Sequence, residues 1–338
     1  MDPFTHALTS AALDRAGLSR VSRLAMAILI VSGVAADLDL LSYFGGAEAY
    51  FHYAHTLLHS ITGSAVLVIV IALIFWLAGR RHPKSPLKFG RVFLLCAIGA
   101  TAHVLLDLAT ASGVQLFWPF RARWFSWDLL GGIDPWILAI LLAGLLVPGL
   151  FRLVSEEIGE KKKKRGPSKG AIAAVVLMLA YVGWRAQLHY RAGEMLLAND
   201  YHGQVPMVAG AFPDSSSPLS WRGVVDTANT IEEVNVRFGV GAVFDATSSL
   251  THYKPEGSAA LDAARRAPLA QEFLRYARFP LATQESLGDG YRVTLRDLRF
   301  RDDVNTPDDL IAVIDLDSAL KVRGQTIEFA NGQSDRPR

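Results

Sequence analysis

The sequence predicts a polytopic α-helical membrane domain followed by a small α+β or mainly β extracytoplasmic domain. Of its 338 residues, 51% are hydrophobic and 20% are charged, and the mean hydropathy is +0.25. Soluble domains average about 25% charged residues, so this balance favours a membrane protein. Long apolar stretches fill the first 190 residues, and strand-like alternation follows them. We therefore expect a helical transmembrane domain with a metal site at residues 1–190 and a water-facing domain at residues 191–338.

Five apolar stretches are candidates for membrane spans. A span needs about 20 predominantly apolar residues to cross roughly 30 Å of hydrocarbon. Residues 61–79, 92–111, 136–154 and 171–188 meet this requirement, and residues 24–44 begin apolar but end in Asp37 and Asp39. This last stretch also fits a signal peptide cleaved after Ala36, although its charged start is weak. Residues 3–17 are too short for an ordinary span, so we expect a surface or re-entrant helix there.

Two basic loops predict the orientation in the membrane. Residues 80–91 contain Arg80, Arg81, Lys84, Lys88 and Arg91, and residues 161–165 read KKKKR. Cytoplasmic loops concentrate Lys and Arg, so both loops should lie inside and everything after about Tyr190 outside. We expect a multi-pass protein of the bacterial inner (cytoplasmic) membrane. The net charge of +2 is small and the basic runs serve topology, so we expect no nucleic-acid partner.

Strand-like patterns dominate the C-terminal region. Apolar residues alternate at Val234, Val236, Phe238 and Val240, and again at Tyr291, Val293 and Leu295, as half-buried strands require. Leu320 and Val322, then Ile327 and Phe329, flank an Arg-Gly turn and predict a hairpin. The Ala and Leu content of residues 259–279 predicts one helix. His202 and His252 fit surface positions better than metal ligands.

Histidine and aspartate residues are scattered through the membrane domain, where ionisable groups are costly and often functional. His103 and Asp107 are four apart in one apolar stretch and so share a helical face. His55 and His59 have the same spacing on a predicted helix. Each pair also fits a buried hydrogen bond that fixes helix packing. Asp37 and Asp39 are two apart, which indicates a helix end or loop where both side chains can turn inward.

The predicted topology brings these groups to one membrane level. Asp37 with Asp39, His55 with His59, Asp107, and Asp134 all fall near the non-cytoplasmic face, which predicts a divalent metal site. Imidazole with carboxylate suits Zn, Mn or Fe, and an excess of carboxylate suits Mn or Mg. Cys96 is the only cysteine, so a thiolate zinc cluster is excluded. Such a site would support metal-assisted hydrolysis.

The stretch after Asp107 is rich in aromatic residues. It reads LATASGVQLFWPFRARWFSWDLLGGIDPW and fits an aromatic belt in contact with membrane lipid. It also fits a substrate rim in which Arg121 and Arg123 bind an anionic lipid headgroup or another phosphoester.

Taken together, these motifs resemble the YdjM-type family. The resembling stretches are MDPFTHALTSAAL, AADLDLL, LLHSITG, HVLLDLATASGVQLFWPF and RWFSWDLLGGIDPW, within about residues 1–155. The resemblance implies an inner-membrane-associated, metal-dependent hydrolase, a family also described as LexA-binding. It singles out a larger residue set: His6, Asp37, Asp39, His59, His103, Asp107 and Asp134. LexA binding would need a cytoplasmic surface, and this chain offers only short loops and its N-terminus there.

Two departures from the family pattern leave one histidine open. Ala36 stands where the family usually has proline, and HYAHTLLHS replaces a His-Arg-Gly and Thr-His-Ser pattern. The upstream histidine is therefore His52 or His55, and we favour His55 because its spacing to His59 suits one helical face. If His6 joins the site, its helix must dip into the membrane from the outer face.

These observations predict a membrane-bound metal-dependent hydrolase that acts on a lipid-linked or phosphoester substrate. His59, His103, Asp107 and Asp37 or Asp39 would hold the metal, and Asp134 would act as general base. Because Asp134 precedes Pro135, it equally fits a helix N-cap. The alternatives are a regulatory or binding membrane protein with a structural His/Asp cluster, and an ion transporter. The sequence leaves the metal, the substrate and the oligomeric state open.

Overall fold

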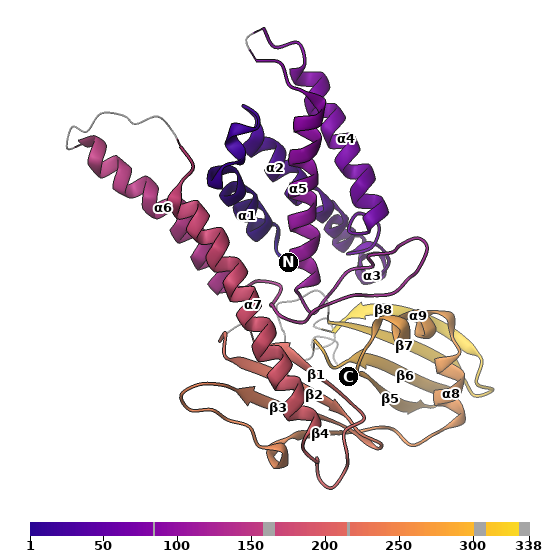
Figure 1. Ribbon diagram of the computed structural model, residues 1–338. Coiled ribbons are helices and arrows are strands. Elements are labelled where there is room, and N and C mark those ends of the chain that lie inside the picture. The colour runs from indigo at the N-terminus through magenta and orange to yellow at the C-terminus, as the bar shows by residue number, and fades with distance from the viewer. Residues whose placement is uncertain (84, 158–165, 215–216, 301–308, 331–338) are drawn as a thin grey trace. The chain divides into compact units, whose positions relative to one another are not determined.

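The chain forms two compact units in the computed structural model (Figure 1), which describes residues 1–83, 85–157, 166–214, 217–300 and 309–330. The helical unit comprises Met1–Asp39 and His55–Gln187, and the C-terminal unit comprises Leu40–Ala54 and Leu188–Arg338. The segment Leu40–Ala54, called the inserted segment below, thus interrupts the helical unit in sequence but belongs to the C-terminal unit.

The membrane-type helices match the apolar stretches of the sequence. They are α1 (Pro3–Ala16), α2 (Ala25–Val34), the 3-10 helix η2 (Ala35–Gly45), α4 (Ile61–Gly79), α5 (Phe89–Leu108), α6 (Pro135–Glu157) and α7 (Lys169–Leu197), with the short η1 (Leu18–Arg20) after α1. Among the described residues, four helical segments are long and apolar enough to cross a membrane: Ala25–Gly45, Ile61–Gly79, Phe89–Leu108 and Lys169–Leu197. The apolar part of α6, Pro135–Leu150, is shorter.

Local chemistry sets both ends of α1. The Asp2 side chain accepts a hydrogen bond from the backbone N–H of Thr5 at 2.9 Å, and Pro3 occupies the first turn. Such a cap satisfies N–H groups that have no partner within the helix. Gly17 ends the helix with a φ of 153°, which glycine adopts without a side-chain clash. The 14 residues of α1 span only about 21 Å, too little for an ordinary crossing.

Small residues bring α2 close to its neighbours. A Cβ on Gly33 would lie 2.3 Å from Ser10 Oγ of α1, and a Cβ on Gly99 of α5 would lie 2.9 Å from the Leu29 carbonyl oxygen of α2. Glycine therefore allows a helix approach that larger side chains would prevent. This contact places the end of α2 beside the second half of α5.

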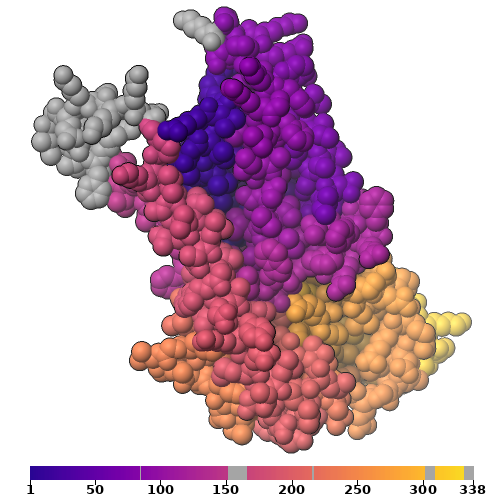
Figure 2. Space-filling model, in the orientation of Figure 1, coloured from indigo at the N-terminus to yellow at the C-terminus, as the bar shows by residue number. Residues whose placement is uncertain are grey.

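Helices α4 and α5 form an antiparallel hairpin that separates two chemically different ends. Val68, Ile71, Leu95 and Cys96 are buried in their shared apolar core, and the atoms of the helical unit are closely packed on the face seen in the space-filling view (Figure 2). His59 precedes α4 and Asp107 lies near the end of α5, whereas the basic 80–91 loop joins their other ends. The 19 residues of α4 separate the two ends by about 28 Å.

The described part of the C-terminal unit forms two four-stranded antiparallel sheets. The first has the order β1 (Val208–Pro213), β2 (Ser220–Asp226), β3 (Thr230–Arg237) and β4 (Leu250–Tyr253), with the short η3 (Ala246–Ser248) before β4. The second has the order β5 (Pro280–Leu287), β6 (Gly290–Asp297), β7 (Leu310–Asp317) and β8 (Val322–Phe329). Helices α8 (Ala259–Arg265) and α9 (Pro268–Tyr276) connect the two sheets.

Each sheet has its own apolar core. Leu188, Ala192 and Leu196 from the end of α7 are buried against the first sheet with Trp221 and Val236. The second sheet is covered by α8 and α9, and also by α3 (Ala47–Tyr53) from the inserted segment, through apolar side chains that include Ala47, Tyr50, Leu261, Phe273 and Ile327. The predicted fold class, a helical membrane part followed by a β-rich domain, is therefore confirmed.

Three local predictions are wrong. His55 and His59 lie in the turn between α3 and α4, not on a helix, because His55 adopts a φ of 55°. The helix predicted over residues 259–279 is broken into α8 and α9, since Pro268 has no N–H to continue the first helix. The hairpin predicted around Gly324 turns earlier, where Leu320 has a φ of 62°, and Gly324 lies within β8 opposite Asp315.

The span predicted over residues 24–44 changes helix type along its length. It is α-helical to Val34 and continues as the 3-10 helix η2 to Gly45. The second basic loop, at residues 161–165, lies outside the described residues. Its predicted role in topology therefore stays a prediction.

Candidate metal centre

Six His and Asp side chains meet at one end of the helical unit. They form two groups that share Asp107: His6, Asp37, His103 and Asp107 in one, and His55, His59 and Asp107 in the other. In each group, every residue offers one atom that could bind a metal, either an imidazole nitrogen or a carboxylate oxygen. These atoms all lie within 4.8 Å of one another. These six residues are called the cluster below. They come from the start of α1, from η2, from the turn before α4 and from the end of α5, and all six are buried.

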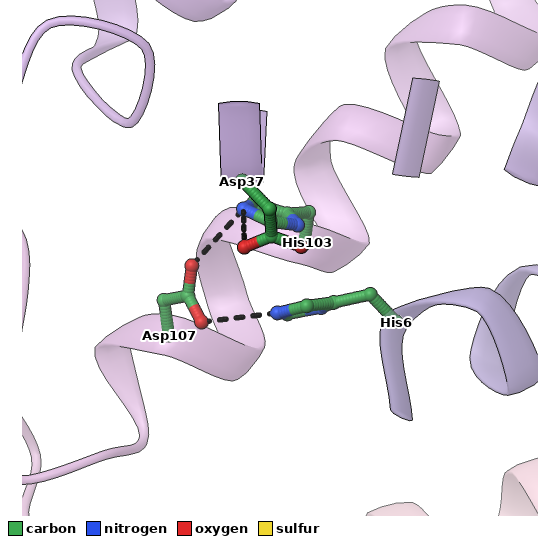
Figure 3. Close-up of side chains that lie close together, drawn as sticks. All are labelled: His6, Asp37, His103 and Asp107. Atoms are coloured by element: carbon green, nitrogen blue, oxygen red, sulfur yellow. Dashed lines mark hydrogen bonds and ion pairs between the residues drawn. The ribbon is translucent and has the colours of Figure 1, made fainter. Parts of the chain in front are cut away.

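The backbone of α2 orients His103. Its Nδ1 lies 2.8 Å from the carbonyl oxygen of Gly33. A carbonyl only accepts hydrogen bonds, so Nδ1 carries the proton and a neutral ring leaves Nε2 with a lone pair. That Nε2 lies 3.1 Å from Asp107 Oδ2, as the i, i+4 spacing on α5 predicted (Figure 3).

Asp39 orients His59 in the same way. Its Oδ2 lies 2.8 Å from His59 Nδ1, and the Asp39 side chain is only 6% exposed. A carboxylate accepts this N–H and fixes the tautomer, so a neutral His59 also presents a lone pair at Nε2. The two oriented rings point these atoms at each other.

With both rings neutral, three electron-pair donors meet here without a proton between them. His59 Nε2 lies 3.0 Å from His103 Nε2 and 3.0 Å from Asp107 Oδ2, and the third edge of this triangle is the 3.1 Å contact of His103. Lone pairs this close repel one another unless a positive charge is added, either by protonation of a ring or by a cation. Neighbouring ligands at roughly 2.1 Å from a divalent ion lie about 3 Å apart. The donor set and its spacing fit such an ion.

His6 completes the arrangement from α1. Its Nε2 lies 3.1 Å from Asp107 Oδ1, and its ring stacks at a tilt on His103 with centroids 3.9 Å apart (Figure 3). The α-amino group of Met1 also contacts Asp107 Oδ1. The short α1 thus reaches the same level as the ends of the longer helices.

Asp37 lies beside His103 in the cluster, and both of its carboxylate oxygens lack a hydrogen bond from the described residues. Its Oδ1 lies 3.9 Å from His103 Nε2, and neither oxygen has a hydrogen-bond partner among the described residues (Figure 3). Buried carboxylate oxygens without partners are rare in folded proteins and call for a bound ion or water. The orphaned carboxylate is a second observation that fits a cation.

The structure places the two alternative histidines apart. The His55 ring lies 4.8 Å from that of His59, and the His55 carbonyl accepts a hydrogen bond from Gln115 N at 3.0 Å. His52 lies on α3 in the C-terminal unit, where its Nδ1 is 3.8 Å from Glu272 Oε2. Geometry therefore brings His55 to the cluster, although not through the helical spacing that the sequence suggested.

Asp134 caps a helix. Its Oδ1 accepts the N–H groups of Trp136 and Ile137 at 3.0 and 3.1 Å, and its Oδ2 accepts the Tyr181 hydroxyl at 3.2 Å. These contacts match the predicted N-cap of α6. A role as general base stays a prediction.

Sequence reasoning missed two partners of the cluster. The Gly33 carbonyl carried no signal, because any residue offers a backbone oxygen. The orienting bond from Asp39 to His59 was also missed, since the two residues are 20 apart and only the turn before α4 brings them together.

The sequence matches the family described as "YdjM inner membrane protein" over residues 1–192, more than half of the chain. Neither the curated proteins nor the solved structures contain a match to this chain.

Proposed function

Because the chain belongs to the YdjM inner membrane protein family, we propose that it is a metal-dependent hydrolase whose cluster holds one or more divalent cations. The observation that carries this proposal is the triangle formed by His59 Nε2, His103 Nε2 and Asp107 Oδ2. A hydrogen bond at Nδ1 of each imidazole orients its Nε2 towards this triangle. In the hydrogen-bond alternative, at least one ring must be protonated.

Each side chain has a distinct proposed role. His59, His103 and Asp107 would hold the cation, together with Asp37 and His6. Asp39 and the Gly33 carbonyl would fix the two rings and keep their lone pairs directed inward, as partners of metal-binding histidines do. A cation bound here would supply Lewis acidity, polarising a scissile ester and lowering the pKa of a water molecule.

The proposed substrate is a phosphoester, presented by a lipid. The loop between α5 and α6 is tied to the cluster-bearing turn, since Gln115 N donates to His55 O and Ile61 N donates to Leu116 O at 2.9 Å. Arg121 and Arg123 are exposed on this loop and have no ion-pair partner within the described part of the chain. Guanidinium groups suit phosphate oxygens.

Exposed aromatic residues on the same loop suit a lipid substrate. Phe120 is 82% exposed, and Trp127 is 46% exposed. Such side chains favour the boundary between headgroups and hydrocarbon. The loop would therefore meet a lipid headgroup at the level of the cluster.

The proposed orientation puts the cluster at the outer face of the membrane. The basic loop with Arg80, Arg81 and Arg91 joins the opposite ends of α4 and α5, and such loops stay in the cytoplasm. The C-terminal unit would then be extracytoplasmic in a multi-pass protein.

Metal analysis of the full chain tests the proposal. Protein purified in detergent without chelator should carry a divalent metal, and His103→Ala should lose it. His52→Ala is the matched control, because it removes a histidine outside the cluster, and it should retain the metal. Wild-type protein with far less than one equivalent of any divalent metal, even after incubation with Zn²⁺ or Mn²⁺, would favour a structural hydrogen-bond cluster.

A second measurement tests the substrate class. Metal-loaded protein should release product from a phosphoester lipid in mixed micelles, and Arg121→Ala with Arg123→Ala should raise KM more than they lower kcat. The paired control is Arg80→Ala with Arg81→Ala, at the other end of the helices. Equal effects of the two pairs would contradict a substrate role for the loop.

A further inference from the structure

A buried arginine on α7 contacts an irregular segment beside the cluster. Arg185 is only 1% exposed, although it lies in a helix that is long and apolar enough to cross a membrane. Its Nε donates a hydrogen bond to the carbonyl oxygen of Leu129 at 2.9 Å, and both residues belong to the helical unit. An ionisable side chain buried in such a helix is costly, so its contact marks a candidate functional position.

The contacted carbonyl lies in residues 127–134, called the strap below, which lead into α6. The strap is irregular in conformation, and buried backbone groups need hydrogen-bond partners. The end of α5 supplies an acceptor, since the N–H groups of Leu129 and Leu130 donate to Ala109 O at 2.8 and 2.9 Å. Arg185 supplies a donor for Leu129 O. The strap is thus fixed to α5 and to α7 at the same residue, Leu129.

The strap also contacts the start of α1. Gly132 O accepts a hydrogen bond from the backbone N–H of Asp2, the residue before α1, at 2.9 Å. His6 lies four residues beyond Asp2, about 6 Å further along the chain axis of α1. Ala109 lies two residues after Asp107. The 3.1 Å contact between His6 Nε2 and Asp107 Oδ1 therefore joins the two helix ends that the strap connects.

A second side chain of α7 holds the other end of the strap. The Tyr181 hydroxyl donates to Asp134 Oδ2 at 3.2 Å. Tyr181 and Arg185 are four apart, so they lie on one face of α7. Between these two contacts, Leu130 of the strap and Met178 of α7 are buried in one apolar core. Helix α7 therefore fixes the strap at both ends.

We propose that Arg185 is a positioning residue for the cluster and acts through the strap. With Leu129 O bound to Arg185, the strap holds the end of α5 and the start of α1 in a fixed relation. That relation keeps His6 Nε2 on Asp107 Oδ1. Arg185 thereby raises the metal affinity of a site to which it offers no ligand, because a guanidinium only donates hydrogen bonds. The part of this inference that concerns affinity rests on the proposed function.

The test compares two matched substitutions on α7 in the full chain. Arg185→Met removes the donor but keeps a long side chain, and Arg191→Met changes an exposed arginine of the same helix. Arg185→Met should weaken Zn²⁺ or Mn²⁺ binding roughly tenfold, as loss of an outer partner of a ligand does, and Arg191→Met should leave it within about twofold. Arg185→Lys keeps a donor without the planar fork, so its affinity should lie between those of Arg185→Met and the wild type. Equal affinities of Arg185→Met and Arg191→Met would overturn the inference.

A double-substitution cycle with His6→Ala tests the route of the effect. If Arg185 acts by positioning His6, Arg185→Met should weaken metal binding by less than about twofold in a chain that already carries His6→Ala. A general loss of stability would instead reduce the affinity equally with and without His6→Ala. That equal reduction would therefore overturn the proposed route.

Hydrogen–deuterium exchange of the metal-free protein supplies a readout that is independent of the proposed function. Residues 2–8 and 127–132 should both exchange faster in Arg185→Met than in Arg191→Met. Faster exchange confined to residues 127–132 would overturn the inference, because it would show that the strap does not fix α1. If wild-type protein binds no metal, the proposed function fails, and the exchange of residues 2–8 decides whether Arg185 positions His6. Should Arg185→Met not fold, the same comparison of Arg185→Lys with Arg191→Lys decides the question.

Discussion

Substitution of Asp39 tests whether this carboxylate orients a ligand or is one itself. In the structure its Oδ2 binds His59 Nδ1 at 2.8 Å, and no member of the cluster other than His59 is joined to it by a described hydrogen bond or ion pair. Asp39→Ala should therefore leave the metal bound but more weakly. Asp39→Asn keeps an oxygen that accepts the Nδ1–H of His59, so its metal affinity should lie between that of Asp39→Ala and that of the wild type.

The expected magnitude follows from the type of contact. Loss of an outer partner of a ligating histidine typically costs 10- to 100-fold in metal affinity. At about 1.4 kcal/mol per factor of ten, this corresponds to roughly 1.4–2.8 kcal/mol. The bond is charge-assisted and almost fully buried, which places the expected effect of Asp39→Ala towards the upper end of this range.

Calorimetric titration of Mn²⁺ or Zn²⁺ into chelator-stripped protein measures the effect. Asp200→Ala, at an exposed position, is the control and should match wild type. If Asp39→Asn binds the metal as weakly as Asp39→Ala does, the orienting role is refuted, because that result is expected when Asp39 is itself a ligand. It is refuted equally if Asp39→Ala binds metal as tightly as wild type.

Three further predictions address catalysis, topology and the C-terminal unit. Asp134→Asn retains a capping oxygen, so normal expression with normal hydrolysis indicates a cap alone, whereas a loss of roughly 10²–10⁴ in kcat indicates a general base. Alkaline phosphatase fused after the last residue should be active in cells, and a reporter active only in the cytoplasm would contradict the proposed orientation. Burial acts to raise the pKa of Glu232, but hydrogen bonds from Ser249, Thr230 and Thr251 outweigh it and lower the pKa below its ordinary 4.5. Its contribution to stability is therefore present above pH 4.5 and lost as the pH falls through the lower folded value, so Glu232→Gln should flatten the acid side of a melting-temperature profile. An unchanged profile in that variant would show that other groups control acid unfolding.

Residue spacing in the sequence predicted only part of the cluster. The i, i+4 spacing of His103 and Asp107 correctly indicated neighbours on one helical face, because an α-helix fixes that relation locally. The same argument applied to His55 and His59 reached the right pair for the wrong reason, since a left-handed turn at His55 brings the rings together.

The sequence by itself determined the apolar helices that are able to cross a membrane, the strand-rich C-terminal region and the family. These follow from local properties, namely runs of apolar residues, period-two alternation and short motifs. Only the tertiary structure decided that the Asp39 carboxylate lies on His59 Nδ1 and the Gly33 carbonyl on His103 Nδ1, because those contacts join residues 20 and 70 positions apart. It also decided that the inserted segment belongs to the C-terminal core. Its apolar residues needed a partner, and nothing in residues 40–54 specifies that this partner lies more than 200 residues away.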